Sequence, residues 1–431
     1  MHATTSSPPY SPPTGRPAPL AQAPLTVPRA TAHYIGALLG PSLLLLPGLA
    51  AQKAGAAAVL AWTAMLVLSG LIALVFSRLG TSVGSHAGVA GYATAGLGAH
   101  FGRATGWAFL LGVITGVPVV CLIGGQYVAA VTARPGYGPA FAGGLLVLVL
   151  VLRLFGANSG ARLQLLLMGL LLALLVVAVG ASAGSARVGN WQPFLDHGWS
   201  GVAGAAGHLM MAFVGWEAAA PLTARLGDAR RQLPRVITAA FVITSLVYLS
   251  LAGALQAVLG SEAATTTPLA ALLAVAVGPV GPWLAAVIAV LLTLGVTNAY
   301  LASATATAQH LLYGPEGAYR SGSSRAALTV GVSAFGAVLL GLSALQVVDL
   351  SLLVALPTAF FLLVYLVCCA SAARLLTRGA RGAAVAAALA TVALLATAGL
   401  VSVAALTLVA VVTSVPGLMS KRRSGTSISP S

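Results

Sequence analysis

Residues 212–235 read AFVGWEAAAPLTARLGDARRQLPR, an apolar segment with one acid, Glu217, followed by a loop with four arginines. The rest of the 431-residue chain repeats this alternation of long apolar runs and short basic connections. Only 6% of the residues are charged and 59% are hydrophobic, whereas about a quarter of the residues in soluble domains are charged. Too few charged side chains remain to cover a water-facing surface. The sequence therefore predicts an all-α membrane protein that crosses the bilayer many times.

The lengths of the charge-free runs predict about twelve transmembrane helices. A helix needs about 20 residues to cross about 30 Å of hydrocarbon. The run 382–420 is too long for one crossing, so we expect two spans that turn near Gly399. The Gly-rich segment 79–100 is expected at the interface rather than as a thirteenth span. The other ten spans are expected at 30–52, 54–77, 104–133, 135–152, 163–186, about 200–224, 236–261, about 280–313, 326–348 and 350–373.

The basic residues predict the orientation of these spans. With the N-terminus in the cytoplasm, every lysine and arginine falls on the inner side except Lys53, Arg134 and Arg187. This bias follows the positive-inside rule, so we expect a bacterial-type plasma-membrane protein with both termini in the cytoplasm. Residues 1–29 are expected to form a disordered tail rich in Pro, Ser and Thr, and residues 421–431 a second tail. No basic stripe is interleaved with aromatic residues, so nucleic-acid binding is not expected.

Motifs of common enzyme and metal sites are absent from the sequence. It contains no HExxH and no Walker loop. It has no GxSxG nucleophile elbow either, because the matching strings at 80–84 and 180–184 follow apolar helical runs and not strands. Cys121, Cys368 and Cys369 lie inside apolar runs without metal-ligand spacing. We therefore expect no enzyme activity, no metal and no cofactor beyond a coupling ion. Lipid is the expected environment, and the sequence leaves homo-oligomerisation open.

Two of the twelve spans are predicted to be interrupted. The first contains Gly40-Pro41-Ser42, and a proline inside a helix removes a hydrogen bond and clashes with the preceding turn. The sixth contains Glu217, the only acid well inside a span, two residues after Gly215. A charge at that depth costs about 3 kcal/mol, so such residues are functional candidates. A simple proline kink and a purely structural glutamate are the alternative interpretations.

The positions of the two interrupted spans indicate a transport site. Spans one and six each begin a set of five, and an odd number inverts the second set relative to the first. Interrupted helices at matching positions of inverted repeats are typical of substrate sites at the membrane midplane. Half-helix N-termini there suit an anion, and the carbonyls at half-helix C-termini suit a cation. An α-amino acid carries both charges on adjacent atoms. A non-transporting membrane scaffold or receptor, the alternative class, needs no such pair of breaks.

Three stretches of the sequence resemble the amino acid–polyamine–organocation superfamily: 212–235, GPSLLLLPGLAAQKAG at 40–55 and FGRATGWAFLLGVITGVPVVCLIGGQYV at 101–128. Among its members the chain is most similar to bacterial exporters of methionine and branched-chain amino acids. The resemblance implies inverted repeats at about 30–186 and 200–373, with two peripheral helices at about 382–420. Pro41 and Ser42 replace family residues that bind the substrate carboxylate, and the Ser42 hydroxyl is expected to compensate for the missing proline N–H. The implied substrate-binding residues are Gly40, Pro41, Ser42, Leu43, Phe213, Val214 and Gly215.

Charges near the midplane predict the substrate class and the coupling ion. Apart from Glu217 no charge is expected there, which favours a neutral, apolar amino acid. Glu217 is also the candidate proton carrier, so we expect export by proton antiport, with an uptake permease on the same fold as the alternative. Sodium coupling is less expected. The hydroxyl groups that could bind sodium are better interpreted as helix-to-helix hydrogen bonds, and they belong to Thr293, Thr297, Ser303 and Thr305.

Overall fold

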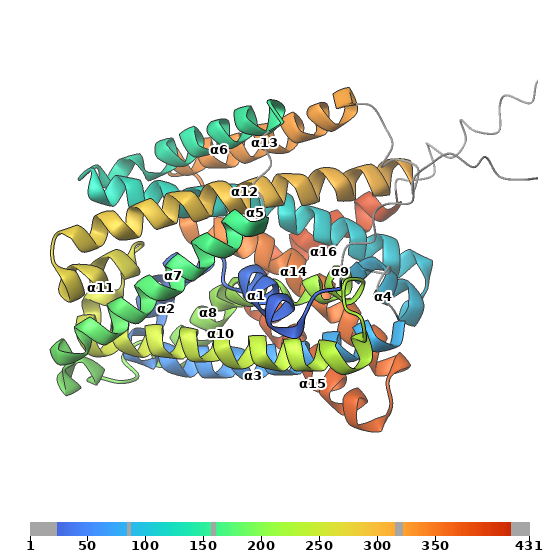
Figure 1. Ribbon diagram of the computed structural model, residues 1–431, viewed down its shortest axis with the longest axis horizontal. Coiled ribbons are helices and arrows are strands. Elements are labelled where there is room, and N and C mark those ends of the chain that lie inside the picture. Colours follow the sequence, from blue (N-terminus) through green and yellow to red (C-terminus); the bar gives the residue numbers. More distant parts are fainter. Residues whose placement is uncertain (1–23, 84–87, 157–160, 315–321, 415–431) are drawn as a thin grey trace, which may run out of the picture.

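The computed structural model describes residues 24–83, 88–156, 161–314 and 322–414, and within these ranges the chain is a bundle of helices without strands (Figure 1). The expected tails fall outside these ranges, except for residues 24–29. Residues 84–87 of the Gly-rich segment are outside them too. The fold class expected from the sequence, an all-α membrane protein, is confirmed.

The helices follow the apolar runs of the sequence closely. Nine stretches in the described ranges are long and apolar enough to cross a membrane. One of them, Ser42–Val83, joins two helices through a short 3-10 turn at Gly55–Ala57. The helices that supply the spans are α1 (Val27–Leu38), α2 (Ser42–Ala54), α3 (Ala58–Val83), α5 (Ala99–Val131), α6 (Gly138–Leu154), α7 (Ala161–Ser182), α8 (Gly198–Leu209), α9 (Ala219–Thr223), α10 (Ala229–Leu259), α12 (Val280–Tyr313), α13 (Gly322–Ala344), α14 (Leu350–Leu375), α15 (Arg378–Thr397) and α16 (Leu400–Ser414).

Two of the expected spans are interrupted, and the last apolar run divides into two helices as expected. The first consists of α1 and α2, and the sixth consists of α8 and α9 with non-helical backbone between them. The last run divides into α15 and α16 at Gly399, where the backbone has a φ of 53°. That is the turn the sequence predicts, because a left-handed φ is easily adopted only by glycine.

Two short helices connect spans and show the relation between the repeats. Each has 10 residues, α4 (Gly88–Leu97) after α3 and α11 (Pro268–Val277) after α10. Each ends at a glycine with positive φ, 98° at Gly98 and 73° at Gly278. A helix of this length reaches about 15 Å and cannot cross the bilayer. The segment 79–100 is therefore not a thirteenth span, and α11 is a second short helix that the span prediction passes over.

The packing of these helices shows that the two sets of five spans are inverted copies. Helix α4 packs on α5 and α14, whereas α11 packs on their counterparts in the other set, α12 and α7. In the same way α1 packs on α10, and α8 packs on α3. Figure 1 shows α4 at the right end of the bundle and α11 at the left end. Matching helices at opposite ends are what an inverted repeat produces.

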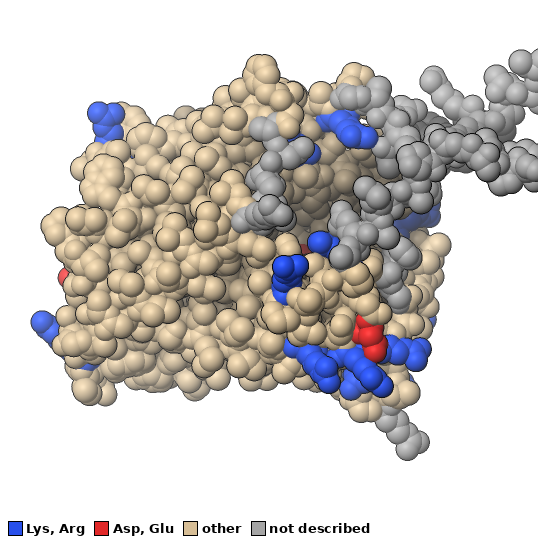
Figure 2. Space-filling view, in the orientation of Figure 1, with Lys and Arg blue, Asp and Glu red and all other residues tan. Residues whose placement is uncertain are grey.

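The centre of the bundle is the crossing of α5 with α12. Small residues allow this close approach, since a Cβ atom on Gly116 would lie 2.9 Å from the ring of Tyr300. The outer surface of the bundle carries few charged side chains between its two ends in the view of Figure 2. Basic side chains gather at the ends, with the larger group at the end that holds the α9–α10 loop. This is the distribution expected of a bundle embedded in lipid.

Candidate functional site

The first break exposes backbone donors at the start of α2. Helix α1 ends at Leu38, and α2 begins at Ser42. The N–H groups of Leu43 and Leu44 donate to the carbonyls of Gly40 and Pro41 at 3.1 and 2.9 Å. The Ser42 N–H makes no such bond within the described ranges. The N-terminal end of α2 therefore has an available donor and the positive end of a helix dipole.

The second break contacts the first directly. Between α8 and α9 the chain forms two short 3-10 turns, Met210–Phe213 and Trp216–Ala218, joined by extended backbone at Val214 and by Gly215. Gly215 has a φ of 139°, which L side chains rarely adopt. A Cβ atom on Gly215 would lie only 2.8 Å from the Ala37 carbonyl oxygen. Glycine is needed here both for the backbone conformation and for the contact between the two interrupted helices.

Buried tyrosines contact the backbone carbonyl groups of the second break. Such groups must be satisfied inside the protein at membrane depth. Three tyrosines from α1, α10 and α14 place their hydroxyls against this backbone. Tyr34 donates to the Trp216 carbonyl and Tyr248 to the Ala212 carbonyl, both at 2.8 Å. The Tyr365 hydroxyl lies 3.3 Å from the Phe213 carbonyl but has a nearer acceptor, described below. The sequence analysis missed these residues, because three tyrosines scattered over distant helices form no local pattern.

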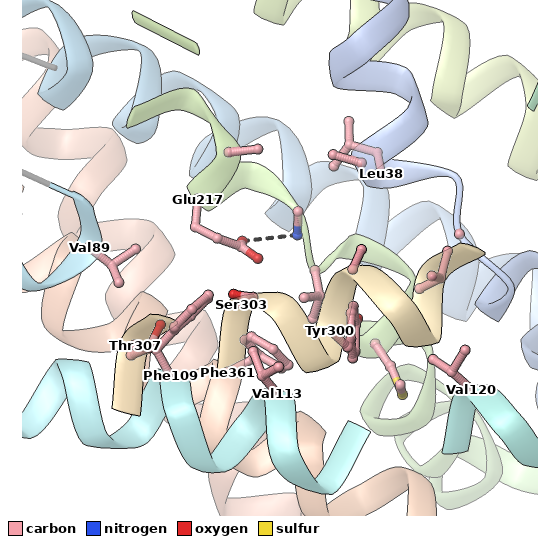
Figure 3. A pocket seen from close by; sticks show the side chains of 18 of the residues that line it. Leu38, Val89, Phe109, Val113, Val120, Glu217, Tyr300, Ser303, Thr307 and Phe361 are labelled. Carbon is pink, nitrogen blue, oxygen red and sulfur yellow. Dashed lines mark hydrogen bonds between the residues drawn. The ribbon is translucent and has the colours of Figure 1, made fainter. Parts of the chain in front are cut away.

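Glu217 is held by two donors and keeps one oxygen available. The Gly215 N–H and the Tyr365 hydroxyl both donate to Oε2, at 2.9 and 2.7 Å. Neither bond involves Oε1, and no described basic side chain lies within salt-bridge distance of the carboxylate. In Figure 3 the side chain points across the cavity toward α12, where Ser303 lies. The half-buried carboxylate can therefore bind a cation or a proton through its second oxygen.

A cavity of about 580 Å³ lies where the two breaks meet α5, α12 and α14. It follows α12 from Val296 to Leu311, and in Figure 3 Thr307 lies on the same side of the cavity as Val89 of α4. Most of its walls are apolar, formed by residues such as Val89, Phe109, Val113, Val120 and Phe361. An amphiphilic cavity between two interrupted helices of an inverted repeat is the architecture of a secondary transporter.

Six of the eight residues expected at the site line this cavity: Gly40, Pro41, Ser42, Val214, Gly215 and Glu217. Leu43 and Phe213 do not line it, and their side chains pack in the core at 0% and 3% exposure. The Phe213 ring packs 5.3 Å from that of Tyr248. The sequence analysis missed the cavity residues of α5 and α14, since an apolar side chain inside an apolar helix gives no signal of its orientation.

The hydroxyl groups along α12 serve different purposes. Of the four hydroxyl-bearing residues that the sequence analysis weighed as sodium ligands, only Ser303 lines the cavity. The other three bond within or between helices: Thr293 to the Val120 carbonyl at 3.3 Å, Thr297 with the Cys121 thiol at 3.4 Å and Thr305 with Thr329 at 3.2 Å. The described residues also contain no cluster of three or more His, Cys, Asp or Glu side chains able to hold a metal ion.

Comparison with known proteins gives the family. A family model described as amino acid permease matches residues 25–422. The chain therefore belongs to the amino acid permease family, and its resemblance to the wider superfamily is confirmed. It is a multi-pass membrane protein of a family of amino-acid transporters.

Several bacterial relatives are similar to this chain. The amino acid permease YecA of Bacillus subtilis (strain 168) is 28% identical over 360 residues, which are 81% of this chain and 84% of YecA. The L-methionine/branched-chain amino acid exporter YjeH of Escherichia coli (strain K12) is 32% identical over 225 residues, 49% of this chain and 51% of YjeH. The branched-chain amino acid permease BcaP of Bacillus subtilis (strain 168) is 23% identical, over 52% of each chain. All three names describe transport across a membrane rather than catalysis.

Proposed function

We propose that this protein exports neutral, apolar amino acids across a bacterial plasma membrane in exchange for protons, by alternating access around the two broken helices. The observation that carries the proposal is the cavity at their contact. It combines an available helix N-terminus, an available carboxylate oxygen and apolar walls. We place both termini of the membrane-embedded protein in the cytoplasm, because the basic residues predict that orientation.

The two breaks offer complementary poles to a zwitterion. The Ser42 N–H and the dipole of α2 suit the substrate carboxylate. The last carbonyls of α1, at Gly36 and Ala37, and the open oxygen of Glu217 suit its ammonium group. Contact between Gly215 and Ala37 keeps these poles close together, as the adjacent charges of an α-amino acid require.

The cavity walls support an apolar substrate side chain. No lysine or arginine belongs to the described lining, and Glu217 is its only acid. A charged substrate side chain would be buried there without a partner, at a large cost in free energy. The names of YjeH and BcaP, which include methionine and branched-chain amino acids, point to the same substrate class.

Coupling to protons follows from the single carboxylate. A proton and a substrate ammonium group both neutralise Glu217, so each weakens the binding of the other. Competition at one site is the requirement for antiport. The name of YjeH favours export, whereas the names of YecA and BcaP state no direction. An uptake permease on the same fold is the second candidate.

Flux in proteoliposomes tests this function. Vesicles that contain the purified protein are loaded with labelled leucine, methionine, arginine or glutamate, and an acid-outside pH gradient is imposed. We expect the gradient to accelerate the efflux of leucine and methionine only. Selective transport of arginine or glutamate would contradict the substrate class. Gradient-independent efflux would contradict proton coupling, and faster efflux under the reversed gradient would favour cotransport with protons.

A further inference from the structure

The first halves of the two broken helices each carry a histidine at the same position. His33 in α1 precedes Gly40 by the same seven residues by which His208 in α8 precedes Gly215. Because the repeats are inverted, α1 and α8 belong to opposite halves of the bundle. The two histidines are therefore equivalent residues that lie toward opposite sides of the membrane. Neither touches the substrate cavity.

The two halves differ in this structure. Ala37 and Ala212 are also equivalent, three residues before Gly40 and Gly215. Ala37 is exposed and lines the cavity, whereas Ala212 is only 1% exposed. The half with α1 is thus open and the half with α8 is closed. In the alternating access proposed above, the opposite state opens the half with α8 and closes the half with α1.

His208 is packed in the closed half as a neutral ring. Its Nδ1 lies 2.8 Å from the Gly204 carbonyl, which only accepts, so Nδ1 carries the hydrogen. Its Nε2 is completely buried and has no hydrogen-bond partner in the described ranges. Two charged groups act on the ring, Lys53 at the end of α2 and Asp349 at the start of α14. The Asp349 carboxylate already caps α14 by accepting from the Leu352 N–H at 2.8 Å.

His33 is half-buried like His208, but it borders open space in its half. It is partly exposed beside a small pocket of about 160 Å³. Tyr34, Leu222 and Arg225 also line this pocket, and Arg225 is the charged group that acts on the imidazole. Water can reach and solvate a charged His33 in this conformation, because the ring lies next to open space.

Protonation of each ring has a different free-energy cost in the two conformations. A proton on Nε2 of His208 would bury an N–H donor and a positive charge without a partner, which is expensive. The same proton costs little once that half opens to water. The argument holds in reverse for His33, which borders a pocket here and loses that open space when its half closes.

We propose that His33 and His208 are a pair of proton-binding sites, one in each gate of the transporter, and that each holds its own gate open when protonated. A proton on His33 favours the conformation seen here, and a proton on His208 favours the opposite one. The pair lets each aqueous side influence the conformation through its own pH. This inference rests on alternating access and is independent of the role of Glu217.

A cysteine in place of Ala212 reports on the closed gate. The native cysteines Cys121, Cys368 and Cys369 are buried, so the parent chain gives a low background. Maleimide labelling of purified Ala212→Cys protein in lipid nanodiscs is measured at about pH 7.5 and about pH 5.5, which bracket histidine titration. Rates are divided by those of a Gly189→Cys protein, whose cysteine lies in an exposed loop, because thiol reactivity itself depends on pH.

Asparagine variants distinguish the effect of a proton on His33 from that of a proton on His208. Asparagine keeps an amide donor near the Nδ1 position and cannot become charged. The double variant His33→Asn/His208→Asn gives the baseline, including any contribution from Glu217. Relative to it, acidification should increase labelling in His33→Asn, where only His208 titrates, and decrease it in His208→Asn. Each change should be several-fold and at most about tenfold per pH unit, because one proton binds to each ring. The control His197→Asn removes an exposed histidine at the start of α8 and should change neither response.

The outcomes distinguish this inference from the proposed function. Responses of the same sign in both single variants, or single variants that match the double variant, overturn the histidine pair. If the histidine pair is overturned but added leucine still changes the labelling of Ala212→Cys, alternating access holds without the histidine pair. If Ala212→Cys reacts under no condition, alternating access fails as well. His33→Gln and His208→Gln repeat the test should an asparagine variant fail to fold.

Discussion

At the residue scale, the contact between the broken helices requires that residue 215 has no Cβ atom. We expect Gly215→Ala to abolish transport, because the added Cβ would lie 2.8 Å from the Ala37 oxygen at a φ of 139°. Backbone strain of this kind costs about 1–3 kcal/mol. Gly204→Ala in α8 is the matched control, since nothing lies within 4 Å of its added Cβ. Leucine flux and thermal unfolding in detergent measure both variants. An active, stable Gly215→Ala protein would show that the two helices separate without loss.

The residue scale also shows what sequence patterns can reveal. Glu217 and Gly40–Ser42 are conspicuous because an acid or a Gly-Pro pair is out of place in an apolar run, and the structure puts them together at the cavity. Leu43 has no such signal, and it lies in the core. For Phe109 or Phe361 the sequence gives no orientation, because the surrounding helix is apolar on every face. Only the packing of α5 and α14 places these rings beside the cavity.

At the element scale, the breaks persist because other helices bond their backbone. Tyr34→Phe should destabilise the protein by about 1 kcal/mol, since it removes the 2.8 Å hydrogen bond to the buried Trp216 carbonyl, which then keeps only the Ala219 N–H as a donor. Tyr137→Phe removes a hydroxyl from a residue that is 57% exposed and should leave stability unchanged. Thermal unfolding in the same detergent compares the two. Equal melting temperatures for both variants would mean that water replaces Tyr34 as the donor.

Elements were predictable where length and helix-breaking residues decided them. Runs of about 20 apolar residues gave the spans, and the division at Gly399 was expected from the length of 382–420. Helix α11 was missed because ten apolar residues fit an interfacial segment as well as a helix. Its role becomes clear only through α4, the helix that packs in the equivalent place at the other end of the bundle.

At the scale of the whole molecule, the basic residues should determine orientation. Reporter fusions after residue 420 are expected to show a cytoplasmic C-terminus, because arginines and lysines concentrate on that side. Fusions near Arg187, in the loop after α7, should report the outside. An external C-terminus would contradict the expected orientation.

The central claim, that substrate and proton share Glu217, is tested most directly by one pair of flux measurements. Glu217→Gln keeps the shape of the side chain and the Tyr365 contact but cannot bind a proton as a carboxylate does. In proteoliposomes we expect this variant to lose leucine efflux driven by a pH gradient and to retain leucine exchange without a gradient. Exchange shows that the variant is folded and binds substrate. Full gradient-driven efflux by Glu217→Gln would contradict the account.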